Sequence, residues 1–242
     1  MRILLVLLLA GLLPIAQASA EDWEFASGEG KVSLLELFTS EGCSSCPPAE
    51  EWFSQLRQSP LLWRQVVPVA FHVDYWNYLG WSDPNSSPQW SARQREHCRE
   101  WKARSIYTPE FVLNGHEWRI GDNFSSGGNP GVLKLKVRKT GEVDASFAPI
   151  SQTGGPYLLN VTPMACGVSQ EVSRGENAGK TLHHDFIALA LAQAPLEFDS
   201  KGVISTHLSI PKEVAKKMDA VAAWVSTGSN PAPIQSVGGW TK

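Results

Sequence analysis

Residues 33–48 constrain the fold of this 242-residue chain more than any other stretch. An apolar run over residues 33–38 predicts a strand that is buried on both faces. Cys43 and Cys46 follow it, and then two prolines, which suit the first turn of a helix because no N–H partner is needed there. Apolar residues then recur at helical spacing. The stretch therefore predicts a strand, a turn that carries both cysteines, and a helix over residues 47–58.

The two cysteines are the strongest chemical signal in the chain. A thiolate is the reactive form of cysteine, and the partial positive charge at a helix N-terminus favours that anion. A second thiol two residues further on can attack a mixed disulfide and resolve it. We therefore predict thiol–disulfide exchange, with Cys43 as the nucleophile and Cys46 as the resolving thiol.

Two other uses of the cysteine pair stay open. Cys43 and Cys46 could form a structural disulfide in a non-catalytic binding module, or they could bind a metal. Zinc usually takes four ligands, and the sequence contains no second pair of cysteines at this spacing. Copper(I) accepts few, soft ligands, so a copper(I)-handling protein that uses Cys43, Cys46 and His72 is the metal-binding alternative.

The first twenty residues predict a secretory signal peptide rather than a part of the fold. Met1-Arg2 is a short positive region, residues 3–13 are an apolar run, and Ala18-Ser19-Ala20 fits a cleavage site. Export favours lasting disulfides. Cys98 and Cys166 could pair with each other or stay free, and the sequence does not decide between these states.

Composition narrows the class of partner. Hydrophobic residues make up 43% of the chain and charged residues 19%, as in globular proteins. A net charge of −3 argues against a nucleic-acid partner. After the signal peptide, no stretch is long and apolar enough for a transmembrane helix, so we do not expect a membrane protein once the signal peptide is cleaved.

A second apolar run, residues 66–73, ends beside polar side chains. If the two strands are parallel and joined by the helix, they form a βαβ unit, in which functional groups gather at the carboxyl ends of the strands. His72 and Asp74 would then lie near Cys43 and could tune the thiol pKa values or move a proton. The alternative is that both side chains only hydrogen-bond a loop.

An aromatic-rich loop and a helix come next. Residues 75–90 are either a lid or a loop that packs its own aromatic side chains. Ser87 as the N-cap and Pro88 as the first helical residue predict a helix that runs to about residue 104. Cys98 shares a stripe with two tryptophans, which predicts a packed thiol, and the charged residues around it, Arg93 among them, predict a solvent-facing surface.

Residues 111–113, the turn signal Asn114-Gly115 and a return strand predict a β-hairpin, with Thr108-Pro109 just before it. This order of a strand, a CxxC, a helix, a second strand, a helix and Thr-Pro before a hairpin is similar to the thioredoxin fold. The resemblance implies that Pro109 forms a cis peptide bond with Thr108, faces the CxxC and holds extended substrate backbone. It also puts Glu36 near the place of a buried strand carboxylate that helps proton transfer.

More closely, the chain resembles a family of secreted bacterial thioredoxin-like proteins that is catalogued as a domain of unknown function. The resemblance spans nearly the whole mature chain and rests on residues 36–48, 72–76, 107–109, 175–182 and 237–240. The chain departs from the general thioredoxin pattern because Gly42, not tryptophan, precedes Cys43, and Ser44-Ser45 replaces Gly-Pro. The resemblance implies the fold strongly and an activity weakly.

The character of the sequence changes after Asn123. Residues 125–131 have the composition of a linker. Short β-like runs with glycine and proline turns follow, and they predict an antiparallel β-sandwich. His183 and His184 are adjacent and would point to opposite faces of a strand, so they do not easily share one metal ion.

These observations lead to one expectation for the whole chain. After a signal peptide over residues 1–20, we expect an α/β thioredoxin-like domain over residues 21–125 and a smaller, mostly antiparallel β-sandwich domain over residues 131–242. The expected function is thiol–disulfide exchange in the bacterial periplasm, with a protein or small thiol or disulfide as substrate. Exchange between sulfur atoms needs no organic cofactor.

Overall fold

The computed structural model describes residues 22–124, 127–151, 155–198, 204–228 and 230–242. Three α-helices and two short 3-10 helices lie among fifteen strands in this part of the chain. The strands are β1 (Trp23–Ala26), β2 (Ser33–Thr39), β3 (Val66–His72), β4 (Glu110–Leu113), β5 (His116–Trp118), β6 (Gly131–Val137), β7 (Glu142–Pro149), β8 (Tyr157–Ala165), β9 (Val168–Glu171), β10 (Thr181–His184), β11 (Ile187–Ala188), β12 (Ala192–Phe198), β13 (Ile204–Ser209), β14 (Ala220–Thr227) and β15 (Asn230–Trp240). The helices are α1 (Pro47–Ser54), η1 (Gln55–Gln58), η2 (Asn77–Leu79), α2 (Pro88–Glu100) and α3 (Lys212–Ala215).

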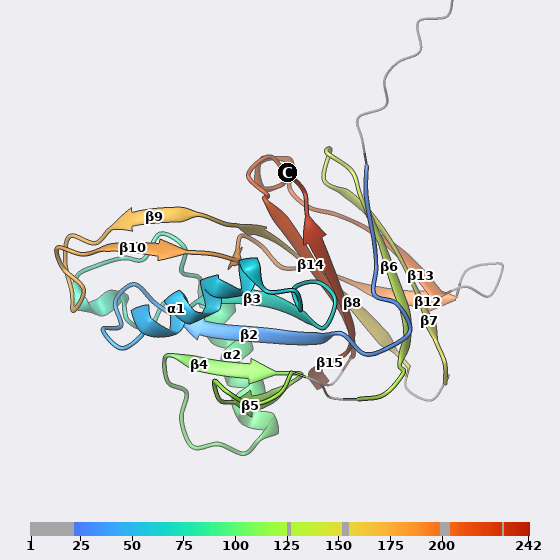
Figure 1. Ribbon diagram of the computed structural model, residues 1–242, viewed down its shortest axis with the longest axis horizontal. Helices are drawn as coiled ribbons and strands as arrows, with labels where there is room; N and C mark the ends of the chain where they lie inside the picture. Colours follow the sequence, from blue (N-terminus) through green and yellow to red (C-terminus); the bar gives the residue numbers. More distant parts are fainter. Residues whose placement is uncertain (1–21, 125–126, 152–154, 199–203, 229) are drawn as a thin grey trace, which may run out of the picture.

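Thirteen of the strands form one mixed sheet. The order along its main path is β1-β6-β7-β13-β12-β8-β11-β3-β2-β4-β5, and β14 pairs with both β8 and β15 off this path. β2 and β3 are parallel, with Leu37 opposite Ala70, whereas most other neighbours are antiparallel. β9 and β10 form a separate two-stranded sheet, which lies beside α1 in Figure 1.

β14 lies between two hydrophobic cores. Successive side chains of a strand point to opposite faces, and those of β14 are buried on both. Ala220, Ala222 and Trp224 pack into the core that contains β2, β3 and α1. The alternate residues, Val221, Ala223 and Val225, pack into the core formed with β6, β7 and β13. One strand therefore serves both the half of the molecule that contains α1 and the half that contains β6, β7 and β13, which Figure 1 shows on either side of it.

The two longer helices cover opposite faces of β2. Thr39 contacts α1 through Glu50, whereas Glu36 contacts α2 through Arg93 and His97. Residues three apart in a strand point to opposite faces, so the two helices sandwich the strand. This double cover explains why all seven residues of β2 are buried.

The expected fold class is wrong. The sequence predicted an α/β thioredoxin-like domain followed by a small β-sandwich, but the chain forms a large mixed sheet with few helices. Strands from both predicted domains join it. β1 and β3, from residues 21–125, pair with β6 and β11, from residues 131–242. The error arose because local patterns identify strands but do not say which distant strands will pair. The division into residues 21–125 and 131–242 stays a prediction.

Several local expectations are confirmed. Ser87 caps α2 by accepting a hydrogen bond from the Gln89 N–H at 3.2 Å. Asn114 and Gly115 connect β4 to β5 with positive φ angles of 52° and 83°, as the favoured two-residue hairpin turn requires. A Cβ on Gly115 would also lie 2.4 Å from Ala232 Cβ, so only glycine fits there.

Other local expectations need correction. Arg93 was predicted on a solvent-facing surface, but it is buried because it pairs with Glu36 and lies over the Trp224 ring at 4.8 Å. Cys98, predicted to be packed, is only half-buried.

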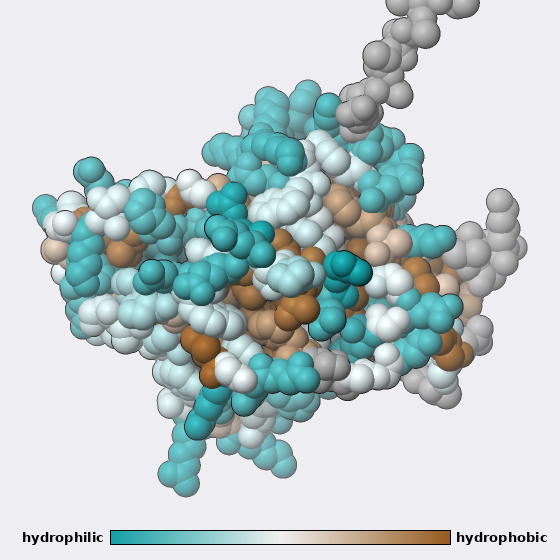
Figure 2. All heavy atoms as spheres, viewed as in Figure 1, coloured by the Kyte–Doolittle hydropathy of each residue, from teal (hydrophilic) through white to brown (hydrophobic). Residues whose placement is uncertain are grey.

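The predicted signal peptide at residues 1–20 lies outside the described residues, as does part of the predicted linker. Among the helices of the described ranges, none combines the length and the apolar character needed to cross a membrane. Figure 2 shows hydrophobic residues gathered in the middle of one face, where the two halves meet, with hydrophilic residues around them.

Candidate functional site

Cys43 and Cys46 form a disulfide at the start of α1. Their Cα atoms are 5.5 Å apart, and Cys46 is the N-cap residue of the helix. Pro47 and Pro48 occupy the first two helical positions, as the sequence predicted. Both cysteines have 0% of their surface exposed, although Ser44 and Ser45 between them are exposed.

The structure brings Cys43 next to Thr108, the residue before Pro109. Cys43 Sγ lies 3.8 Å from the carbonyl oxygen of Thr108 and 3.3 Å from Ser45 Oγ. The Thr108–Pro109 peptide bond is cis, as the resemblance implied. Trp76 Nε1 donates a hydrogen bond to Thr108 Oγ1 at 2.8 Å, which ties the aromatic loop to this segment. A hydroxyl and a carbonyl group therefore stand beside the sulfur atom.

The β9–β10 loop (residues 172–180) covers the disulfide. The side-chain amide of Asn177 donates to the carbonyl oxygens of Glu41 and Cys43, both at 2.9 Å. Glu176 Oε2 accepts from the Ser44 N–H at 2.9 Å, and the Lys180 ammonium binds Asn177 Oδ1 at the same distance. Asn177 is fully buried, so the loop holds the cysteine turn from outside.

A buried polar cluster lies on the α1 side of the sheet, beside the cysteine turn. His184 is placed between two carboxylates, with Nε2 3.2 Å from Glu41 Oε1 and Nδ1 in contact with Glu50 Oε2. Thr39 donates from Oγ1 to the other oxygen of Glu50. Burial alone would lower the pKa of His184, but the two glutamates outweigh it and raise the pKa to about 10.

The aromatic loop completes this cluster. His72 Nδ1 binds Asp83 Oδ2 at 2.7 Å, and Trp81 Nε1 donates to Glu41 Oε2 at the same distance. Burial would lower the pKa of His72, but the Asp83 carboxylate raises it. Burial would raise the pKa of Asp83, but His72 lowers it. The loop predicted as a lid, or as a loop that packs its own aromatic side chains, thus supplies hydrogen-bond partners to the buried side chains of His72 and Glu41.

Two predicted tuning residues lie elsewhere. Glu36 faces α2, where Arg93 Nε binds it at 2.5 Å and His97 Nε2 at 3.0 Å. Burial would raise its pKa, but Arg93 and His97 outweigh burial and lower the pKa to about 2. Asp74 accepts a hydrogen bond from Ser91 Oγ at 2.5 Å, also on α2. Of the three predicted tuning residues, only His72 joins the cluster on the α1 side.

The remaining predicted residues are also placed. Cys98 and Cys166 are unpaired, and burial raises the pKa of the Cys166 thiol to about 12. His183 is exposed and His184 is buried, so the two histidines do point to opposite faces of β10. His72 Nδ1 faces Asp83, and the two cysteines are paired with each other. The copper(I) alternative stays a prediction.

Sequence reasoning missed Glu41, Glu50, Asp83, His184 and Asn177. Glu41 and Glu50 flank the cysteines, and Glu50 sits in the first turn of α1 and points back to Thr39. Asn177 lies in the β9–β10 loop. Its place in residues 175–182, one of the stretches that carried the family resemblance, was the available signal.

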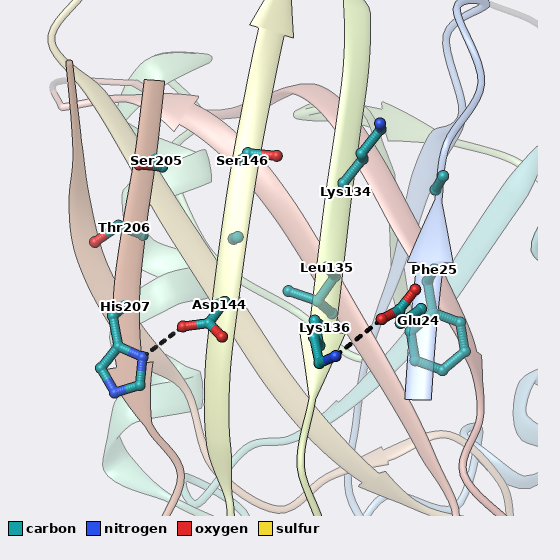
Figure 3. A pocket seen from close by; sticks show the side chains of 12 residues that line it. Glu24, Phe25, Lys134, Leu135, Lys136, Asp144, Ser146, Ser205, Thr206 and His207 are labelled. Carbon is teal, nitrogen blue, oxygen red and sulfur yellow. Dashed lines mark hydrogen bonds and ion pairs between the residues drawn. The ribbon is translucent and has the colours of Figure 1, made fainter. Parts of the chain in front are cut away.

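A depression with a volume of about 760 Å³ lies away from the disulfide, on the outer surface of β1, β6, β7 and β13. Figure 3 shows that Lys136 points to Glu24 and His207 to Asp144, and these pairs lie 3.0 and 2.8 Å apart. Opposite charges on neighbouring strands are the usual pairing of a solvent-facing sheet surface. We therefore place the candidate site at the disulfide and not in this depression.

Two solved structures resemble the chain over most of its length. Protein AGR_C_4864 from Agrobacterium tumefaciens is 22% identical with a TM-score of 0.60, over 88% of this chain and 96% of that one. HBP35 of Porphyromonas gingivalis is 18% identical with a TM-score of 0.61, over 87% of this chain and 75% of that one. At these identities the likeness shows a shared fold and nothing about function. Comparison with curated proteins gives no significant match. Residues 34–226 match the family described as "Protein of unknown function (DUF1223)", and because this span is most of the chain, the protein belongs to that family.

Proposed function

We propose that the protein is a thiol–disulfide oxidoreductase that acts through Cys43 and Cys46. The observation that carries this proposal is the Cys43–Cys46 disulfide at the N-terminus of α1, with Cys43 Sγ 3.8 Å from the Thr108 carbonyl oxygen. In the reduced chain, the Cys43 thiolate attacks a substrate disulfide and releases one substrate thiolate. Cys46 then attacks Cys43 Sγ, which releases the second substrate thiolate and leaves the protein disulfide. The reverse sequence oxidises a substrate dithiol.

The surroundings of Cys43 favour its thiolate. The helix N-terminus supplies partial positive charge, and Ser45 Oγ at 3.3 Å can donate a hydrogen bond to the sulfur. Ser44 and Ser45 are exposed, and Thr108 and Pro109 are half-exposed, so a substrate can approach beside the sulfur atoms. Pro109 has no backbone N–H, and the neighbouring Thr108 backbone is the segment against which a substrate chain would lie.

Burial of the sulfur atoms requires a movement for exchange to occur. The β9–β10 loop holds the cysteine turn through a buried hydrogen bond from Asn177 to the Cys43 carbonyl and an exposed one between the Ser44 N–H and Glu176. Breaking a few such bonds costs about 1 kcal/mol each, so local opening is far less costly than unfolding. Reduction of the disulfide is therefore gated by this loop.

The same burial favours a second candidate function. With both cysteines at 0% exposure, the disulfide could instead hold the turn in place for a binding surface that performs no redox chemistry. This alternative predicts a bond that resists mild thiols and a Cys43→Ala Cys46→Ala variant that loses stability but keeps partner binding.

Mixed-disulfide formation tests the exchange mechanism. In a reduced Cys46→Ser variant, glutathione disulfide should modify Cys43 at least about 10-fold faster than Cys98 or Cys166, since a helix N-terminus lowers a thiol pKa. The two free cysteines of the same chain are internal controls. Cys166 has a raised pKa, and Cys98 lies in the last turn of α2 and not at a helix N-terminus. Modification of Cys43 no faster than Cys98 would contradict the proposal.

Export belongs to the same proposal. The motif at residues 18–20 should be cleaved, and the mature chain should work in the periplasm, where disulfides persist. Expression of the full chain in a Gram-negative host, followed by mass measurement of the periplasmic fraction, should give a product that begins near Glu21. Recovery of only the uncleaved chain in the cytoplasm would contradict this part.

A further inference from the structure

We propose that Glu50, His72 and His184 form a binding site for a divalent transition-metal ion, Zn²⁺ in the first place. The three residues come from α1, β3 and β10, and each offers one ligand atom within 4.8 Å of the other two. All three side chains are buried. The site is separate from the cysteine pair, so the proposal does not depend on the redox function.

His184 gives the most direct sign that the cluster lacks a member. It is 2% exposed, and neither ring nitrogen makes an aligned hydrogen bond within the described structure. Carboxylate oxygens nevertheless lie beside both nitrogens, Glu41 beside Nε2 and Glu50 beside Nδ1. Ligands about 2.1 Å from one tetrahedral ion lie roughly 3.4 Å apart and do not point at each other. The lack of alignment agrees with this arrangement, and the 3.2 Å between Nε2 and Glu41 is close to that spacing, whereas the Glu50 contact is shorter than it.

The other two ligands are already oriented from behind. Asp83 Oδ2 binds His72 Nδ1 at 2.7 Å, which leaves Nε2 as the nitrogen for a metal. Thr39 Oγ1 binds Glu50 Oε1, which leaves Oε2 on the His184 side. A carboxylate on the far nitrogen of a ligating histidine is the usual outer partner in metal sites, because it fixes the ring and raises its basicity.

Space and charge fit a small cation. A cavity of about 10 Å³ is lined by Glu50, His72 and His184 together with Asp185 and apolar side chains, and this volume matches a single water molecule or ion. Glu41 and Asp83 bring further negative charge within the same buried cluster. A divalent cation would offset these carboxylates without the need for protons on the histidines.

The donor set selects the class of metal. Imidazole nitrogen suits zinc and other first-row transition metals, whereas magnesium and calcium prefer oxygen alone. Two histidines and one glutamate leave an open fourth position when they bind zinc. β10 belongs to the small sheet beside α1, so displacement of that sheet would open a route for the ion (Figure 1).

Metal titration of the oxidised full chain tests the site. With Cys43 and Cys46 paired, no thiolate is present there, so chelator-treated protein should take up one Zn²⁺ per chain in competition with a chromophoric chelator. His184→Gln and Glu50→Gln should lower the affinity at least about 100-fold. Asp83→Asn, at the outer partner of His72, should lower it 10–100-fold, the usual effect of such a change. His183→Gln, the exposed neighbour on β10, is the matched control and should leave the affinity unchanged.

Two further readouts keep the test decisive if a variant folds poorly. Zn²⁺ should raise the melting temperature of the wild-type chain and of a Cys43→Ser Cys46→Ser variant, because an ion that binds only the folded state stabilises it. Co²⁺ in the same site should show visible d–d bands without a sulfur charge-transfer band. Absence of stoichiometric binding to folded wild-type protein would overturn the proposal. Binding that survives His184→Gln but disappears with the cysteines would overturn it in favour of a thiolate site.

Discussion

The side-chain amide of Asn177 donates a hydrogen bond to the main-chain carbonyl of Cys43 at 2.9 Å, across 134 residues of sequence. The same amide binds the carbonyl of Glu41, so one buried side chain fastens both ends of the segment that enters the disulfide. Access to the disulfide should therefore depend on this residue more than on any other in the β9–β10 loop.

Replacing Asn177 with alanine should speed reduction of the disulfide. Loss of two hydrogen bonds at about 1 kcal/mol each predicts a 10- to 30-fold increase in the rate of reduction by dithiothreitol. Quenched alkylation followed by peptide mass analysis measures this rate at Cys43. Asn129→Ala, at an exposed loop asparagine, is the control and should leave the rate unchanged. An unchanged rate in Asn177→Ala would show that the loop does not limit access.

Glu36 should matter for stability and not for exchange. It is fully buried between Arg93 and His97, so Glu36→Gln leaves a buried guanidinium without its charge partner. We expect a loss of about 3–5 kcal/mol in the free energy of unfolding, measured with urea. Glu96→Gln on the exposed side of α2 should change it by less than about 0.5 kcal/mol. Glu36→Gln should leave the reduction potential within experimental error, and a shift in that potential would restore the predicted tuning role.

Acid should weaken the protein through the same residue. The pKa of Glu36 is about 2 in the folded chain against an ordinary value of 4.5, so its ionised form stabilises the fold. That contribution is fully present above about pH 4.5 and is lost as the pH falls towards 2. Unfolding free energies at pH 6 and pH 3 should therefore differ more in the wild-type chain than in Glu36→Gln. An equal difference in both chains would contradict the assignment.

Glu110 should have the opposite pH dependence. Burial raises the pKa of this carboxyl to about 7 from 4.5, and the hydrogen bond from Gln94 does not cancel the effect. Its ionisation is easier in the unfolded chain, so it destabilises the fold increasingly from pH 4.5 to 7. Glu110→Gln should raise the free energy of unfolding by about 1–3 kcal/mol at pH 8 and by almost nothing at pH 4. A gain at pH 4 as large as that at pH 8 would rule out this cause.

β14 should couple the two halves of the molecule during unfolding. Trp224 and Val225 are neighbours in the chain but pack into different cores. Trp224→Ala and Val225→Ala should therefore each lower the melting temperature of one shared transition. The expected losses in the free energy of unfolding are about 3–5 kcal/mol for Trp224→Ala and about 2–4 kcal/mol for Val225→Ala. Calorimetry that resolves two transitions, with each variant shifting only one, would support the two separate domains that the sequence predicted.

Much of the local structure followed from the sequence. The apolar run of β2, the Ser87-Pro88 helix start and the Asn114-Gly115 turn were all readable, because each depends on neighbours a few residues apart. The cysteine pair at a helix start was readable for the same reason. These signals place short elements correctly and say little about how the elements assemble.

The assembly was not readable in the same way. The apolar run of β14 is compatible with burial on both faces, as in β2, but nothing in its pattern says that β8 and β15 flank it. The buried cluster joins Glu50, Asp83 and His184 from three segments, and its members became neighbours only through the sheet and the aromatic loop. Residues this far apart in sequence carry no shared period or spacing that could reveal such contacts.

The reduction potential of the Cys43–Cys46 pair tests the central claim most directly. The mature protein would be equilibrated in glutathione buffers and each cysteine assayed separately by alkylation, with Cys98 and Cys166 as unpaired references. The account predicts a potential between about −120 and −270 mV, the range of thiol–disulfide oxidoreductases. A potential below about −300 mV would mark an inert structural bridge and would contradict the proposed exchange activity.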